Sequence, residues 1–311
     1  MKHNDLVLGV DGGGTKTIAW LAPREAPREE SVLGRGNAGP SNMRSVGFET
    51  AIRNVDRAIQ LAFDEAQLDR RAVSSICLGL AGADRDAERV PLRQWAESER
   101  LADRVIVTND AIPLIYAGFA DGVGVAIISG TGSVVFGRNQ AGQVARCGGW
   151  GHLFGDEGSG YVIALDGLRA VARATDHRGP ETTLLPRFLQ AFHVPNANEL
   201  IPAIYSPNIN RAQIATYADL VFAAAEAGDM VAGSILMDAA DRLAEMVSSV
   251  SIQLGFTGSP IPLAVTGGVL LNQEAYRTLL LSALAIHKID VGLVKLVQSA
   301  VAGAVLMAAS C

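Results

Sequence analysis

The sequence has little positive charge for its length. Its 311 residues carry 26 lysines and arginines against 32 aspartates and glutamates, which gives a formal net charge of −6. Proteins that bind nucleic acid draw most of their binding free energy from a basic face. The acidic balance therefore argues against a nucleic-acid partner. An anionic ligand would have to be bound locally, by backbone amides and a metal ion.

Cysteines and long apolar runs are also scarce. The three cysteines, Cys77, Cys147 and Cys311, lie far apart in the sequence, which favours reduced thiols over a disulfide framework or a C-x-x-C metal clip. No stretch reaches about 18 uninterrupted apolar residues, and the first five residues lack an apolar targeting segment. The sequence thus predicts a soluble cytoplasmic protein without a membrane partner.

The chain lacks the G-x-x-x-x-G-K-[ST] phosphate loop but has another glycine-rich turn. An apolar run over 6–10 ends in Asp11-Gly-Gly-Gly-Thr-Lys16, and a β-branched and aromatic run follows at 17–22. Strands on both sides place the glycines in a hairpin, not at the start of a dinucleotide-binding helix. Glycines let backbone N–H groups approach phosphate, Thr15 and Lys16 add donors, and Asp11 is suited to hold Mg²⁺. The alternative is an ordinary D-G turn without a ligand.

A second segment repeats this layout more than one hundred residues later. Residues 124–137 contain an apolar run, then Ser129-Gly-Thr-Gly-Ser133, then another apolar run. The repetition predicts a duplicated fold whose two hairpins close on one polyphosphate. A third turn, Thr266-Gly-Gly-Val269, follows another apolar run and offers bare backbone to a flat adenine ring.

The periodicity predicts an α/β protein with two domains, each in the order βββαβαβα. The first covers 1–117, with strands at 6–10, 17–22, 31–34, 75–80 and 105–107, a loop at 36–42, and helices at 48–66, around 90–95 and at 111–119. The second covers 118–298 and carries a helical insertion at about 183–254, whose apolar rows are interpreted as core. A helix at about 299–311, dense in small residues, either packs back on the first domain or is an ordinary buried helix.

Asp110 is a candidate catalytic base. It follows the predicted strand at 105–107, and open α/β sheets bind ligands at the carboxyl ends of their strands. A carboxylate there can accept a hydroxyl proton while the oxygen attacks a γ-phosphoryl group. The alternative is structural, because aspartate is among the best helix N-cap residues.

Residues 147–160 contain six glycines in fourteen positions, among polar side chains. So many glycines are entropically costly in a purely structural loop, which favours ligand binding. Trp150 could stack on a sugar face, and Asp156 could accept hydrogen bonds from two hydroxyls. The alternatives are that Trp150 belongs to the core and that Asp156 or Glu157 caps a helix at 161–174. His152 is interpreted as positioned or buried, since no second metal ligand has suitable spacing.

Together these motifs resemble the actin-like ATPase superfamily of sugar kinases, Hsp70 and actin. Within it, the chain is most similar to the N-acetylglucosamine kinase group allied to the BadF/BadG/BcrA/BcrD ATPases. The similarity extends over nearly the whole chain and is carried by motifs beginning at Asp11, Asn109, Ser129, Gly148 and Gly155, with a weaker one at Thr266. It implies two ribonuclease-H-like domains, ATP and Mg²⁺ as cofactors, an amino-sugar substrate and a homodimer.

The resemblance also implies residue roles. Asp11 would belong to the Mg²⁺ site, and Asp110 would take the proton from the 6-hydroxyl of the sugar. The sugar is predicted to be bound by Asn42, Asp110, Gly149, Trp150, Gly151 and Asp156. The nucleotide is predicted to be held by Gly13, Gly14, Thr15, Lys16, Gly130, Thr131, Gly132, Gly267, Gly268 and Asn272.

The leading functional hypothesis is a kinase acting on N-acetylglucosamine, with glucosamine as the second choice of substrate. One alternative is an ATPase that activates a partner reductase, although the paired cysteines that hold an iron–sulfur cluster in such proteins are missing. Another is a non-catalytic sugar sensor, against which the acidic balance and the absence of a helical N-terminal extension both argue.

Overall fold

The computed structural model describes residues 5–25, 27, 29–256 and 258–310, which form two compact units. Unit 1 comprises 1–126, 138–143 and 297–311, and unit 2 comprises 127–137 and 144–296. Unit 1 thus runs past residue 117, the predicted end of the first domain. Its short segment at 138–143 is held to the preceding turn by Arg138, whose guanidinium donates to the carbonyl of Gly122 at 3.0 Å.

Unit 1 is built on a sheet with strand order β3-β2-β1-β4-β5. Strand β1 is antiparallel to β2 and parallel to β4, and β4 is parallel to β5. The elements of this unit are β1 (Leu6–Gly12), β2 (Thr17–Pro23), η2 (Glu29–Ser31), β3 (Gly34–Ala38), α1 (Met43–Val46), α2 (Phe48–Glu65), β4 (Val73–Leu80), α3 (Asp86–Ser98), β5 (Ala102–Thr108), α4 (Ala111–Gly118) and α13 (Val301–Ala309).

The third strand lies later than the sequence predicts. The structure has a short 3-10 helix at η2 and places β3 at Gly34–Ala38, where a strand at 31–34 and a loop from 36 were expected. Added Cβ atoms at Gly34 and Gly36 would overlap the carbonyl oxygens of Ala62 and Ala58 in α2. The two glycines therefore let the helix pack directly on the strand. The predicted strand at 31–34 is therefore wrong, because Gly36 lies within β3 and does not start a loop.

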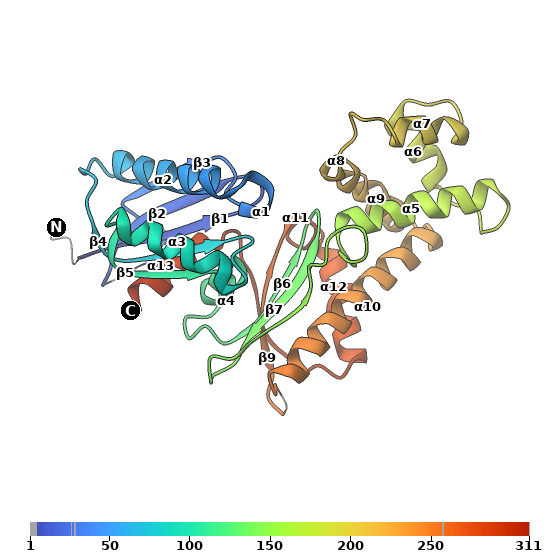
Figure 1. Cartoon of the computed structure of the whole chain (residues 1–311). Coiled ribbons are helices and arrows are strands. Elements are labelled where there is room, and N and C mark those ends of the chain that lie inside the picture. The colour runs from blue at the N-terminus through green and yellow to red at the C-terminus, as the bar shows by residue number, and fades with distance from the viewer. Residues whose placement is uncertain (1–4, 26, 28, 257, 311) are drawn as a thin grey trace. The chain divides into compact units, whose positions relative to one another are not determined.

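Helices cover both faces of the unit 1 sheet, with α2 on one face and α13 on the other (Figure 1). Leu6, Leu8 and Val10 of β1 pack in one core together with the apolar face of α2, whereas Val7 packs with α13 on the opposite face. Period-two alternation with both faces buried is expected of a central strand. The carboxyl end of β1 is thereby fixed between two helical layers.

The small residues of α13 contact other elements of unit 1. A Cβ at Gly9 of β1 would overlap the backbone nitrogen of Val305, and a Cβ at Gly303 would overlap the carbonyl oxygen of Pro113 in α4. The helix thus approaches both neighbours backbone to backbone. Cys77 is buried in this layer.

Unit 2 repeats the sheet pattern of unit 1, with strand order β10-β9-β6-β7-β8. Its elements are β6 (Gly124–Ser129), β7 (Ser133–Arg138), β8 (Val144–Gly148), α5 (Gly160–Thr175), α6 (Leu184–Phe192), η3 (Ala197–Glu199), α7 (Leu200–Ile204), α8 (Arg211–Thr216), α9 (Ala218–Glu226), α10 (Met230–Gln253), β9 (Ile261–Thr266), α11 (Gly268–Asn272), α12 (Glu274–Ile286) and β10 (Val291–Leu296). Unit 2 follows the predicted order as far as β10, and the helix after it, α13, belongs to unit 1, which was one of the two alternatives expected for it. Helices α6–α10 occupy the region of the expected insertion.

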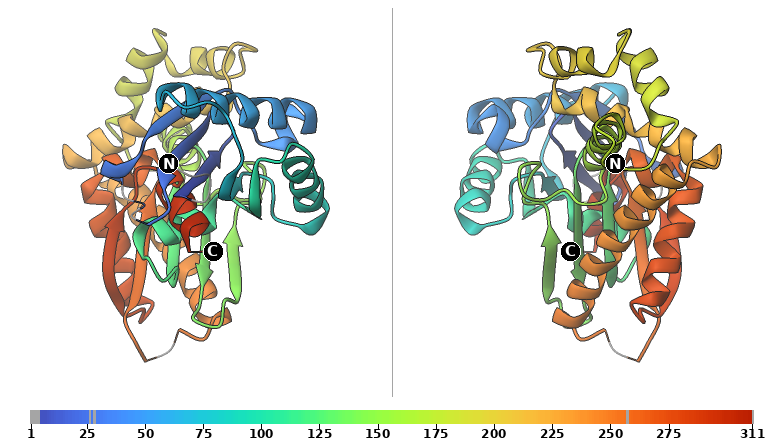
Figure 2. Two further views of the ribbon diagram at one scale, coloured as in Figure 1. Left: turned by 90° about the vertical axis from the view of Figure 1, so that its left-hand side faces the viewer. Right: turned by 90° about the vertical axis from the view of Figure 1, so that its right-hand side faces the viewer.

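The longest helix of unit 2, α10, lies beside α12 (Figure 2). Its N-terminus is capped by Asp229, which accepts hydrogen bonds from the backbone N–H groups of Val231 and Ala232. Within the described residues no single helix is long and apolar enough to cross a membrane. Helices α8 and α9 together with α10 meet that length and composition only as a pair bent by 120°.

Two of the three cysteines lie in the described part of the chain. Cys77 is buried and Cys147 is half-buried, and neither forms a disulfide within the described residues. Cys311 lies outside the described residues.

Candidate active site

The first glycine turn is a tight hairpin between β1 and β2. The strands pair up to Gly12 and Thr17, and the N–H of Gly13 donates to the carbonyl of Lys16 at 2.9 Å. Gly14 has an ordinary negative φ, and a Cβ added there would have no heavy atom within 4 Å in the described part of the chain. Neither backbone conformation nor protein packing therefore requires glycine at position 14, and the position is open to solvent-side approach by another molecule.

Asp11 lies at the carboxyl end of β1, beside this hairpin. Burial of its carboxylate, together with the negative charge of Asp110, raises the pKa of Asp11 to about 7, although Lys16 and the backbone N–H of Ala300 act in the opposite direction. Two carboxylates thus converge from the ends of β1 and β5. A bound cation would relieve both the desolvation and the repulsion.

The residues at this position fit a magnesium ion. Mg²⁺ is usually bound through one or two carboxylates, with waters and substrate phosphates as its other ligands. The described residues contain no cluster of three or more His, Cys, Asp or Glu side chains, so an all-protein metal cage is not found among them. Asp11 with Asp110 nearby matches the sparse ligand set of Mg²⁺.

Asp110 does not cap the helix that it precedes. The side chain of Asn109 takes that role, because its Oδ1 accepts the N–H groups of Ala111 at 3.2 Å and Ile112 at 3.1 Å. The side chain of Asp110 makes no cap hydrogen bond. The interpretation of Asp110 as the side-chain cap of α4 is therefore wrong.

Asn42 is tied to the same hairpin. Its backbone N–H donates to the carbonyl of Gly13 at 3.2 Å, and its side-chain Oδ1 caps α1 by accepting the N–H of Arg44 at 3.1 Å. The amide of Asn42 still has two N–H donors beyond this cap. One direct hydrogen bond thus joins Asn42, which is predicted to bind the sugar, to the first hairpin within unit 1.

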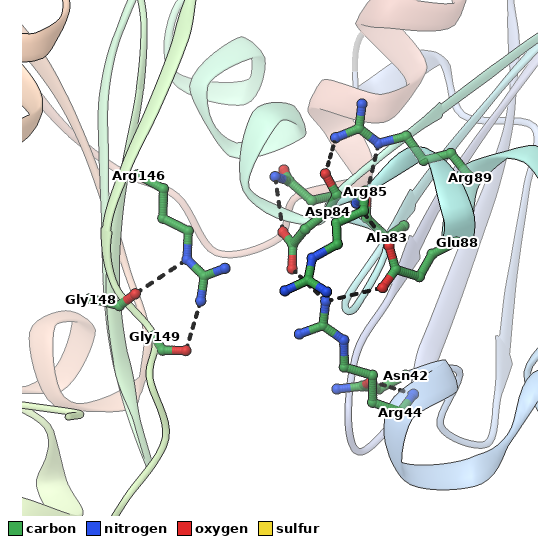
Figure 3. A network of polar contacts seen from close by, with 11 residues as sticks. Asn42, Arg44, Ala83, Asp84, Arg85, Glu88, Arg89, Arg146, Gly148 and Gly149 are labelled. Carbon is green, nitrogen blue, oxygen red and sulfur yellow. Dashed lines mark hydrogen bonds and ion pairs between the residues drawn. The ribbon is translucent and has the colours of Figure 1, made fainter. Parts of the chain in front are cut away.

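A charged network that was not predicted from the sequence begins beside Asn42, at Arg44 (Figure 3). The guanidinium of Arg44 lies 3.3 Å from Asp84 and 3.4 Å from Glu88, and Asp84 also accepts a hydrogen bond from the side chain of Asn109 at 3.4 Å. These contacts join α1 and α3 to the loops that follow β4 and β5. Scattered charged residues gave no periodic signal by which the sequence could reveal the network.

The second hairpin, between β6 and β7, borders a cavity of about 270 Å³ inside unit 2. Four residues predicted to hold the nucleotide line it: Gly130, Thr131, Gly268 and Asn272. A Cβ at Gly130 would lie 3.4 Å from the backbone nitrogen of Gly268. The structure therefore brings together a hairpin tip and a helix start that are far apart in the sequence.

The opposite wall of this cavity comes from helices to which the sequence analysis gave no binding role. It is lined by small and polar residues of α8 and α9 and by one ring, namely Ala212, Ala215, Thr216, Ala218, Asp219 and Phe222. Small side chains beside the glycine turn leave a space suited to a flat ring. The only sequence pattern for this wall is the spacing of the alanines in α8 and α9, and the same spacing is equally typical of ordinary helix packing.

The other two glycines of these turns face protein atoms. Gly267 has φ of 92°, and a Cβ there would overlap the carbonyl of Ser129. A Cβ at Gly132 would lie 2.6 Å from Nη2 of Arg211 and 2.8 Å from a carboxylate oxygen of Asp156. In contrast to Gly14, both positions need glycine for packing inside the protein.

The loop after β8 exposes its tryptophan. The side chain of Trp150 is 68% exposed, with its ring centroid 6.1 Å from that of the exposed Phe154. Gly149 and Gly151 have φ of 71° and 86°, a backbone region that favours glycine. The core explanation for Trp150 is therefore wrong. Helix α5 is capped by Ser159, which also rules out the capping role considered for Asp156 and Glu157.

Asp156 is buried next to the second hairpin. Its Oδ1 accepts the N–H of Ser133 at 3.2 Å, and its Oδ2 lies 3.1 Å from Nη2 of Arg211. The backbone of Asp156 has φ of 62°, a left-handed conformation that aspartate tolerates better than most residues. Asp156, which is predicted to bind the sugar, thus contacts the second hairpin directly.

The fold and these sites define a class of protein. Two units with the same strand order, each with a glycine hairpin between its first two strands, form the two-domain fold of actin-like ATPases. The sequence model of the BadF/BadG/BcrA/BcrD ATPase family matches residues 8–308, and the chain belongs to this family.

Curated relatives cover most of the chain. It is 34% identical over 266 residues to an N-acetylmuramic acid/N-acetylglucosamine kinase of Clostridium acetobutylicum, with 86% of both chains covered. It is 35% identical over 276 residues to an N-acetyl-D-glucosamine kinase of Dictyostelium discoideum, with 85% of each covered.

Solved structures share the fold. A candidate N-acetylglucosamine kinase from Chromobacterium violaceum aligns with a TM-score of 0.72 at 23% identity, covering 98% of this chain and 99% of the other. A ROK family glucokinase from Streptomyces griseus, in complex with glucose and AMPPNP, aligns with a TM-score of 0.58 at 18% identity, covering 98% and 100%.

Proposed function

We propose that this protein is an ATP-dependent kinase that transfers the γ-phosphoryl group to the 6-hydroxyl of N-acetylglucosamine. The observation that carries the proposal is the separation of roles at the end of β5, where Asn109 caps α4 and Asp110 lies beside Asp11. The names of the two curated relatives, both at about one third identity, support the same reaction.

The proposed reaction is direct in-line transfer. The carboxylate of Asp110 accepts the proton of the sugar 6-hydroxyl, the oxygen forms a bond to the γ-phosphorus, and the bond from phosphorus to the bridging oxygen breaks to release ADP. Asp11 would hold Mg²⁺, which, when bound, neutralises phosphate charge. Backbone N–H groups around Gly13 and Gly14 would donate to phosphate oxygens.

The nucleotide is assigned to both hairpins and to the cavity of unit 2. Adenosine would occupy the space between Gly268 and the alanines of α8 and α9, with Asn272 at its edge. Thr15 and Lys16 of the first hairpin, and Gly130, Thr131 and Gly132 of the second, would meet the phosphates. The reaction requires both hairpins to reach one ATP molecule, which stays a prediction.

The sugar is assigned to Asn42 and Asp110 of unit 1, and to Gly149, Trp150, Gly151 and Asp156 of unit 2. An exposed indole can stack on a sugar face, and the Asn42 amide retains donors for hydroxyl oxygens. We also propose that the protein is cytoplasmic and forms a homodimer, as the family resemblance implies. The dimer is checked by its sedimentation at low and high protein concentration.

The test is ADP release, first without sugar and then with N-acetylglucosamine, glucosamine, N-acetylmuramic acid, N-acetylmannosamine and glucose. The expected result is negligible release without sugar and the highest kcat/KM with N-acetylglucosamine. The phosphorus of the product should couple to the C6 protons in NMR spectra. Equal ADP release with and without every sugar would contradict a kinase and favour an ATPase that acts on a partner protein.

A further inference from the structure

Arg211, the first residue of α8, lies against the tip of the second hairpin. Its Nη2 is 3.1 Å from the carboxylate of Asp156 and would be 2.6 Å from a Cβ at Gly132. Its guanidinium carbon lies 5.9 Å from the ring centroid of Tyr161. All four residues belong to unit 2, so this cluster is defined within one compact body.

The cluster is incompletely hydrogen-bonded. In the described part of the chain, Nε of Arg211 and Oδ2 of Asp156 are buried atoms without a hydrogen-bond partner, so the ion pair is close but poorly aligned. The side chain of Arg211 is nonetheless 37% exposed, against 5% for Asp156. Unsatisfied buried polar atoms are rare in native proteins and often mark a functional site. Here the arginine keeps donors for an additional anion and can reach solvent.

Arg211 is the first residue of a helix that lines the cavity beside the second hairpin. The next residue, Ala212, lines that cavity, as do Ala215 and Thr216 of the same helix. The hairpin residues Gly130 and Thr131 line it from the other side. One short helix therefore provides a wall of the cavity and places a guanidinium at the hairpin tip, where the predicted phosphate donors lie.

We propose that Arg211 binds the terminal phosphates of a nucleoside polyphosphate held in this cavity. The inference rests on the proposed function, which assigns the cavity to ATP. The planar guanidinium has five donors in a fixed fork that matches phosphate oxygens. Asp156 holds this fork against the hairpin when no nucleotide is bound, and on binding the arginine donates to phosphate while the carboxylate continues to accept the N–H of Ser133.

The test compares nucleotides that differ only in their phosphates. Binding of adenosine, ADP and ATP to the full chain is measured by calorimetry with Mg²⁺ and without sugar. For Arg211→Ala we expect the Kd for ATP to rise about ten- to one-hundred-fold, the scale for losing hydrogen bonds to a charged group. The Kd for adenosine should stay within about twofold, because Arg211 would not contact the nucleoside. Arg211→Lys, which keeps the charge but not the fork, should give a smaller loss for ATP.

Arg242→Ala is the matched control. Arg242 forms an exposed ion pair with Glu245 at 3.0 Å on α10, so its loss should change none of the three affinities. Unchanged ATP binding by Arg211→Ala, or an equal loss for adenosine and ATP, would overturn the phosphate role. If Arg211→Ala does not fold, Arg211→Lys decides by the same ratio of ATP to adenosine affinity. Failure of the wild-type chain to bind any nucleotide would instead reject the proposed function itself.

Discussion

The two glycine hairpins occupy equivalent places in two sheets of identical strand order, yet their surroundings differ. Around Gly14 in the first hairpin the space is open, and the nearby charged groups are Asp11 and Asp110 at strand ends together with Lys16. At the tip of the second hairpin, Gly132 is packed against Arg211 and Asp156. A duplicated framework has thus acquired acidic groups in one copy and an internal ion pair in the other.

This difference suggests that the two units have different roles in the proposed reaction. Adjacent carboxylates in unit 1 suit proton transfer and metal binding, which need anionic groups near the reacting atoms. The cavity of unit 2, with its small side chains and a guanidinium nearby, suits recognition of a nucleotide. Substitutions at equivalent places in the two units should therefore have different consequences.

The largest expected effect is at Asp110. Asp110→Asn should lower kcat by at least about one hundred-fold, the usual scale for loss of a general base, while retaining sugar binding. The helix cap stays in place in this variant because Asn109 provides it, and the melting temperature checks that the variant is folded. Asn109→Ala is the contrast, and it should cost about 1 kcal/mol of stability through loss of the cap. Near-normal turnover by Asp110→Asn would remove Asp110 from the role of base.

The second-largest expected effect is the change in stability with pH that is caused by Asp11. Because the pKa of Asp11 is raised to about 7 from a usual value of 3.8, the folded state binds more protons than the unfolded state between these values. In EDTA, stability should therefore fall by a few kcal/mol as the pH rises from about 4 to 7, relative to Asp11→Asn. The readout is the difference in unfolding free energy between the two proteins.

The stabilisation of the wild type by Mg²⁺ should depend on pH. Mg²⁺ should stabilise the wild type more at pH 8, where Asp11 is ionised, than at pH 5, and should have little effect on Asp11→Asn. Equal stabilisation of both proteins at both pH values would mean that the metal binds elsewhere.

Paired glycine substitutions compare the hairpins directly. Gly14→Ala should leave the melting temperature unchanged, because its Cβ enters open space, but should raise the KM for ATP by about tenfold if a phosphate approaches the backbone there. Gly132→Ala should lower the melting temperature, since its Cβ would press on Arg211 and Asp156. A Gly14→Ala variant with unchanged ATP kinetics would argue for an ordinary turn.

The smallest effect is expected at Trp150. Trp150→Ala should raise the KM for the sugar several-fold with little change in stability, because the side chain is 68% exposed. Trp20→Ala in unit 1 is the matched control. Trp20 is only 8% exposed, so its truncation should cost about 3–5 kcal/mol of stability. An unchanged sugar KM for Trp150→Ala would contradict the stacking role.

Much of the framework was predictable from local patterns. The apolar run at 6–10, the glycines and the run at 17–22 predicted the β1–β2 hairpin, and the three- and four-residue spacing of apolar residues predicted α2 almost to its ends. The position of β3 was missed because Gly34 and Gly36 serve helix packing, which depends on contacts with α2 that are distant in sequence.

The site was predictable only in part, for a similar reason. Glycine and acidic motifs marked the strand ends, but the pairing of Arg211 with Asp156 joins positions more than fifty residues apart through a helix of ordinary composition. The cap at Asn109 likewise depends on which of two neighbouring polar side chains turns toward the helix. Such choices are set by tertiary geometry, and no single-sequence pattern records them.

The division of work between Asn109 and Asp110 has an evolutionary consequence. Since Asn109 and not Asp110 caps the start of α4, exchanging Asp110 leaves the cap of this helix in place. Under the proposed mechanism, a turnover-deficient protein that still recognises its sugar is thus a single amide-for-acid replacement away. Under the same mechanism, an enzyme could evolve into a sugar receptor by substitution at position 110 while the cap of α4 is kept.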